Sequence, residues 1–198
     1  MNGLPENTYS RKYHAGVSLG LEVDQRDSGT FPNRGFLLTA EGRGFWGLNS
    51  KSTHFNRLRS DFRAYIPLIS EIVTVALRTG GSMIWGEADF FEMGTLGGTK
   101  NLRGYRRDRF RGDATVYFNG EMRLKLFHLD TYLVHGPVGI MGFYDTGRVW
   151  LTNESSDLWH SSCGGGIWFA PFSKIAVSAT YAVSPEDHII TLRFNMGI

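Results

Sequence analysis

The sequence predicts an all-β protein, and three observations support this. Apolar and polar residues alternate in segment after segment, and no stretch of the 198 residues shows a helical period. Glycine (25 residues) and aromatic residues (14%) are both frequent, as in proteins built from many strands joined by tight turns. The alternating segments are roughly 10–14 residues long, which suits barrel strands that cross a bilayer better than the shorter strands of globular proteins.

In the first half of the chain, each segment keeps its apolar residues on one face. At 15–24, Val17, Leu19 and Leu21 alternate with small or acidic residues. At 56–68, a face with Arg59 and Asp61 lies opposite an apolar face. Turns rich in Asp, Gly, Pro and Asn separate the segments. We expect the first four strands at 15–24, 35–46, 56–68 and 72–85.

The second half carries the clearest pattern. Residues 113–126 alternate throughout, with Phe118 and Leu124 on one face and Glu121 and Arg123 on the other. No helix would produce a period of two over this length. The Gly-rich segment 162–171 predicts a strand whose faces the sequence does not define. We expect the five strands of this half at 113–126, 137–151, 162–171, 174–183 and 188–198.

Alternation alone does not say which face meets solvent, so a soluble sandwich or lipocalin-like barrel remains open. Three features favour a transmembrane barrel. The apolar faces run the whole length of the strands, the polar faces carry charges of both signs that could pair across a lumen, and aromatic residues gather near strand ends. We interpret these aromatic residues as interfacial girdles: Tyr13, Phe36, Trp46, Trp85, Trp150, Trp159 and Trp168.

Several classes of protein are disfavoured. No run of 18 apolar residues exists, which disfavours a transmembrane helix. Residues 1–13 are polar and lack the apolar core of a signal peptide. We expect residues 1–13 to be flexible or to start a strand. The net charge of +2 does not indicate a nucleic-acid partner. No nucleophile motif or metal-ligand spacing is present, so we expect no enzyme activity, metal or cofactor. The single Cys163 is expected to be a buried, inert thiol.

Residues 86–112 form a long loop inside this regular pattern. The loop is rich in glycine and has five arginines between Arg103 and Arg111. Long loops in compact β proteins are usually functional or disordered, and a solvated basic loop is the alternative interpretation here.

The loop also carries a resemblance. Leu102-Arg103-Gly104-Tyr105, preceded by Gly97 and Gly98, resembles the loop-six motif of the BamA/TamA outer-membrane assembly superfamily, also called the bacterial surface antigen family. Asn119–Arg123 resembles that family's next strand, and Phe143-Tyr144-Asp145-Thr146-Gly147 resembles its F-x-D-x-G motif. Asp24–Asp27 with Pro32 and Gly35 resembles its D-x-R-D…P…G hairpin.

The resemblance implies an antiparallel transmembrane β-barrel in a bacterial outer membrane, with about eight or nine of its strands present and the loop 86–112 folded into the lumen. Because an unpaired charge is costly in a confined channel, we expect Arg103 to pair there with the inward-facing Glu121 and Asp145. Gly104 would allow the tight loop tip, and Tyr105 would pack beside it. We call Arg103, Glu121 and Asp145 the lock.

The last strand resembles the family's C-terminal signal, through Leu192, Phe194, Met196 and Ile198, although that signal usually ends on an aromatic residue. The resemblance implies a single domain over 1–198 that is the C-terminal part of a larger barrel. The implied role is assembly or translocation of outer-membrane proteins, with membrane lipid, unfolded substrate proteins and a second copy or missing N-terminal strands as partners. A small closed barrel with a structural or pore role, or an anchor for an exported hydrolase domain, is the alternative.

Overall fold

The structure, a computed structural model, describes residues 11–70, 72–132, 134–152, 157–171 and 175–196. Nine long strands form one antiparallel sheet in which neighbours in the chain are neighbours in the sheet, except where a loop with two short strands intervenes. The long strands are β1 (His14–Asp24), β2 (Gly35–Gly47), β3 (Phe55–Ile69), β4 (Val73–Gly86), β7 (Ala114–Asp130), β8 (His135–Trp150), β9 (His160–Phe169), β10 (Ile175–Val183) and β11 (His188–Met196).

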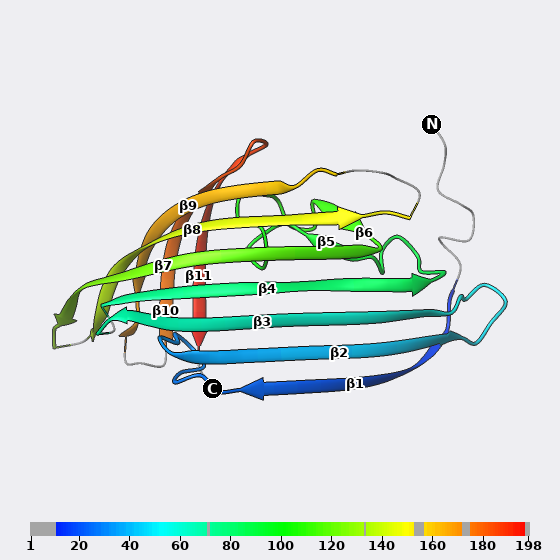
Figure 1. Cartoon of the computed structure of the whole chain (residues 1–198), viewed down its shortest axis with the longest axis horizontal. Coiled ribbons are helices and arrows are strands. Elements are labelled where there is room, and N and C mark those ends of the chain that lie inside the picture. The colour runs from blue at the N-terminus through cyan, green and yellow to red at the C-terminus, as the bar shows by residue number, and fades with distance from the viewer. Residues whose placement is uncertain (1–10, 71, 133, 153–156, 172–174, 197–198) are drawn as a thin grey trace.

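The sheet curves around the segment between β4 and β7, which lies on its concave side (Figure 1). In the part of the chain that the structure describes, β1 pairs only with β2 and β11 only with β10, so the sheet is open at both edges. No helix among the described residues has the length and apolarity needed to cross a membrane.

The nine predicted long strands are all observed, with ends shifted by a few residues. Within the predicted loop, two short strands were not expected: β5 (Gly94–Leu96) and β6 (Phe110–Gly112) pair with each other. Strand β7 extends to Asp130, beyond the expected end, and a register shift between Lys125 and Phe127 turns both Leu126 and Phe127 outward.

The convex face is apolar and exposed, whereas the concave face is polar. Phe118 and Met122 of β7 are exposed, while Tyr117 on the same strand is buried on the concave side. On β8, Phe143, Asp145 and Gly147 are buried on the concave side, the side expected for Asp145, and Tyr144 between them is exposed. This arrangement is the reverse of a soluble sandwich, in which the apolar face would be buried.

Exposed aromatic residues lie where β1 and β9 begin and where β2, β4 and β8 end, which is the same end of the sheet. These residues are Tyr13, Trp46, Trp85, Trp150 and Trp159. The prediction was wrong for Trp168, which is only 5% exposed. It packs inside against Phe31, Met141, Ala170 and Ala176, and its indole N–H donates to the Ile140 carbonyl at 3.1 Å.

The prediction that Cys163 is buried was also wrong, because its side chain is exposed. Cys163 lies opposite Tyr144 in the register of β8 and β9, so the two side chains share the convex face. The glycines that follow Cys163 hide the alternation that would have revealed this.

Candidate functional site

The loop between β4 and β7 is built around a glycine turn. Gly97 and Gly98 follow β5 with φ angles of 120° and 80°, a region that side chains with a Cβ rarely adopt. The amide of Gly98 donates to the Tyr105 carbonyl at 2.9 Å, closing the turn. The Asn101 side chain accepts from the Gly97 amide at 2.9 Å and donates to the Thr95 carbonyl at 3.1 Å. The loop tip is therefore organised by its own residues.

Arg103 lies on the concave side of the sheet and is 6% exposed, and Asp145 of β8 is fully buried beneath it. Arg103 donates from Nε to Asp145 Oδ2 at 2.8 Å and from Nη2 to Oδ1 at 2.7 Å, a bidentate pair. Its backbone amide also donates to Asp145 Oδ2, at 3.1 Å. Both the side chain and the backbone at the loop tip are thus fixed to one carboxylate.

Glu121 of β7 binds the remaining arm of the Arg103 guanidinium, through Oε2. Its other oxygen accepts from Arg123 Nε at 2.7 Å. Phe143 lies directly opposite Glu121 in the register and two residues before Asp145, so its ring lies close to both acids. The Arg103 Cζ atom lies 3.6 Å from the centre of that ring, as in a cation–π contact.

The neighbouring motif residues explain why small side chains are needed. A Cβ added to Gly104 would lie 2.5 Å from the Cβ of Ser162 on β9, and a Cβ on Gly147 would lie 3.0 Å from Leu96 Cδ1. Leu102, Leu96, Tyr105 and Tyr117 form a small buried cluster at this point. The Tyr105 hydroxyl donates to the Ser161 carbonyl at 3.1 Å.

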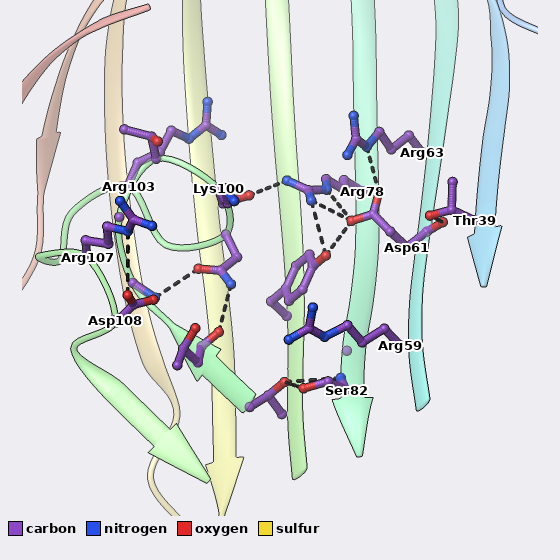
Figure 2. Close-up of a pocket in the computed structure, with 18 of the residues that line it drawn as sticks. Thr39, Arg59, Asp61, Arg63, Arg78, Ser82, Lys100, Arg103, Arg107 and Asp108 are labelled. Carbon is purple, nitrogen blue, oxygen red and sulfur yellow. Dashed lines mark hydrogen bonds and ion pairs between the residues drawn. The ribbon is translucent and has the colours of Figure 1, made fainter. Parts of the chain in front are cut away.

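The concave face of the sheet also binds the backbone of the loop tip, which the sequence did not predict. Arg78 of β4 donates to the Lys100 carbonyl and Arg193 of β11 to the Thr99 carbonyl. Asn119 donates to the Asn101 carbonyl at 2.7 Å. Figure 2 shows Arg78 reaching Lys100 while it also pairs with Asp61.

Asp61 of β3 is the centre of a second charged cluster. It accepts from Arg63 Nε at 2.6 Å and from Arg78 Nε at 2.7 Å, and the Tyr117 hydroxyl donates to it as well. Strands β3, β4 and β7 therefore present a polar wall in which charges of both signs are paired, as expected of residues facing a lumen.

Two other loop arginines, Arg106 and Arg109, lie near the turn between β10 and β11. Arg106 Nε lies 3.0 Å from Asp187 Oδ2, and Arg109 Nε lies 2.7 Å from Glu186 Oε2. Arg106 is largely exposed, as is Arg107, whose nearest carboxylate is its neighbour Asp108 at 3.5 Å. The His188 amide and then Arg106 lower the pKa of the Asp187 carboxyl below its ordinary value. The expected solvated basic loop describes these three arginines and not Arg103.

The structure thus brings Arg103, Glu121 and Asp145 together and places the other motif residues around them. No group of three or more His, Cys, Asp or Glu side chains that could hold a metal occurs in the described part of the chain. Leu192 and Phe194 of β11 are exposed on the convex face. Met196 ends β11, and Ile198 lies outside the described residues.

An antiparallel sheet with an apolar outer face, a polar concave face and a loop bound inside it defines the class of outer-membrane β-barrels. Residues 6–198 match the Omp85 superfamily domain. The chain belongs to the Omp85 superfamily, whose members are outer-membrane assembly or translocation proteins. At the level of the family, this agrees with the expected non-enzymatic role.

The fold is similar to that of BamA from Haemophilus ducreyi, in a crystal structure that lacks POTRA domains 1–3. The TM-score is 0.74 at 21% sequence identity, over 92% of this chain and 42% of the BamA chain. The chain therefore spans less than half the length of that structure. Among curated proteins, no sequence matches this chain.

Proposed function

We propose that the nine strands form the C-terminal part of a larger outer-membrane barrel that helps to insert or translocate proteins, with the loop 86–112 held in its lumen by the lock. The observation that carries this proposal is the buried Arg103, bonded to Asp145 and Glu121 from two neighbouring strands. A bidentate, buried arrangement fixes the loop in one position, whereas an exposed pair would not.

The open edges support the larger barrel. An edge strand in lipid would leave its backbone groups unsatisfied, so β1 needs further strands beside it. Edge strands also offer a template for an incoming strand, which adds by main-chain hydrogen bonds. In a completed barrel, the seam at β11 would be the place where a substrate strand pairs.

The lock is tested by reversing the charge of Asp145. Asp145→Arg places a cation beside Arg103, so the loop should leave the lumen. Protease cleavage within residues 97–112 of the folded protein in vesicles should then rise. Asp157→Arg is the control, because Asp157 pairs with Arg148 at an exposed position away from the loop tip. Unchanged protection of the loop in Asp145→Arg would overturn the lock.

The assembly role is tested by photo-crosslinking to an unfolded outer-membrane protein added to the vesicles. A crosslinker at Ile190 on the edge strand β11 should capture the substrate, and one at Leu58 on the interior strand β3 should not. The alternative is a passive pore, which the polar concave cavity of about 1700 Å³ favours. Ion conductance without capture at Ile190 would support the pore instead.

A further inference from the structure

The turn between β1 and β2, residues 25–34, is folded as a unit. Asp24 accepts from Arg26 Nε at 2.9 Å and Nη2 at 2.7 Å, and Asp27 accepts from the Asn33 amide at 3.0 Å. Gly35 has a φ angle of 102°, and a Cβ there would lie 2.0 Å from the Gln25 carbonyl oxygen. Four residues of the D-x-R-D…P…G pattern thus each shape this turn.

The turn does not stay at its own edge of the sheet. It leaves β1 and enters β2, yet the Phe31 ring packs on Trp168 of β9, with 4.6 Å between ring centres. Phe31 also contacts the buried cluster of Met141, Trp168, Ala170 and Ala176. Asn33 accepts from the Thr74 hydroxyl of β4 at 3.3 Å. The turn therefore crosses the concave face; we call residues 25–34 the inserted turn.

Arg123 of β7 connects the inserted turn to the lock. Its Nη1 donates to the Pro32 carbonyl at 3.1 Å, and its Cζ lies 4.3 Å from the centre of the Phe31 ring. Its Nε donates to Glu121, whose other oxygen binds Arg103. Arg123 and Glu121 are both largely buried. A continuous chain of contacts thus runs from the turn through Arg123 and Glu121 to the loop.

The inserted turn and the loop enter the lumen from opposite ends. The turn follows the end of β1, and the loop follows the end of β4. Because β1–β2, β2–β3 and β3–β4 are each antiparallel, β4 runs in the opposite direction to β1 and ends at the other end of the sheet. Residues 29–32 of the turn and 99–101 of the loop tip line the same cavity of about 450 Å³. The two segments therefore face each other inside the sheet.

We propose that the inserted turn is a second lumen plug and that Arg123 is the positioning residue that couples its seating to that of the loop. When the turn withdraws, Arg123 loses the Pro32 carbonyl and the Phe31 ring and is free to leave Glu121. Glu121 is then held by Arg103 alone, and neighbouring members of a charged network stabilise one another. Release of either plug therefore loosens the other. The coupling rests on the lock proposed above.

The test is hydrogen exchange of the completed barrel that contains these nine strands, folded in phosphatidylcholine vesicles, with peptides that report on residues 25–34 and 97–105. Phe31→Ala should unseat the turn. It should also speed the exchange of residues 97–105 by roughly fivefold or more, the usual scale of coupling between sites, although Phe31 is not bonded to the loop. Phe127→Ala, an exposed phenylalanine on the convex face, is the matched control and should change neither segment.

A double variant isolates the role of Arg123. In an Arg123→Gln background, Phe31→Ala should no longer affect the loop, whereas in an Arg59→Gln background its effect should persist. Heat-modifiable migration checks that each variant is folded, and Phe31→Leu replaces Phe31→Ala if the latter does not fold. Faster exchange of the turn with unchanged exchange of the loop would overturn the coupling. Asp145→Asn distinguishes the two proposals: if it does not release the loop, the lock itself fails.

Discussion

The arginines of the loop fall into two groups that differ in burial. Arg103 is 6% exposed and binds a carboxylate that is fully buried, while Arg106 and Arg109 bind Asp187 and Glu186 at the molecular surface. The pair distances are similar, at 2.7 Å for Arg103–Asp145 and 2.7 Å for Arg109–Glu186. Distance alone therefore does not distinguish a lock from a weak tether.

The difference lies in what happens when a partner is lost. An exposed pair contributes about 0–1 kcal/mol, since water replaces the missing partner. Removing one partner of a buried pair costs about 3–5 kcal/mol, because the other charge stays buried without compensation. Arg103 should therefore decide whether the loop is seated, whereas Arg106 and Arg109 should change the stability of the seated loop only slightly.

The largest expected effect comes from Arg103→Ala. It leaves Asp145 buried without a charged partner, so the free energy that opens residues 97–105 should fall by about 3–5 kcal/mol. Hydrogen exchange of this segment measures the change. Arg107→Ala makes the same substitution four residues later, where the side chain is exposed, and should have little effect. Equal effects of the two variants would remove the distinction between the groups.

Gly104→Ala tests the fit of the loop against β9 with no change of charge. The added Cβ would meet the Cβ of Ser162 at 2.5 Å and that of Ser184 at 3.0 Å. Overpacking of this kind costs about 1–3 kcal/mol, read as faster exchange of the loop tip. Ser162→Gly should restore part of the loss. Gly42→Ala, where nothing lies within 4 Å of the new Cβ, is the control and should be neutral.

The sequence predicted the strands and the members of the lock, because a period of two and a short motif are both visible in residue types. It did not predict the contacts of Arg78, Arg193 and Asn119 with the loop tip, since their acceptors are backbone carbonyls, which every residue carries. Strands β5 and β6, of three residues each, are too short to show a period. Around Cys163 and Trp168, the run of glycines removes the alternation, so the sequence does not show that Cys163 is exposed and Trp168 is buried.

Glu186→Gln tests the exposed Arg109–Glu186 pair, which should contribute less than the buried Arg103–Asp145 pair. The amide keeps the size of the side chain but removes the charge that faces Arg109, so the opening free energy of the loop should change by no more than about 1 kcal/mol. Hydrogen exchange of residues 105–112 provides the measurement. A loss as large as that in Arg103→Ala would show that the turn between β10 and β11 holds the loop as firmly as the lock does.

The smallest expected effect is that of pH on the Arg106–Asp187 pair. The pKa of Asp187 is lowered from its ordinary value of 3.8, first by the His188 amide and then by Arg106. A carboxyl with a lowered pKa stabilises the seated loop fully above its ordinary pKa, and this contribution is lost as the pH falls through the lowered value. The test compares the exchange rate of residues 105–112 in the unmodified protein and in Asp187→Asn at each pH. The ratio of the two rates should stay constant between pH 7 and pH 5, and the two rates should become equal only below pH 3.8. Convergence near neutral pH would mean that another group titrates at this surface.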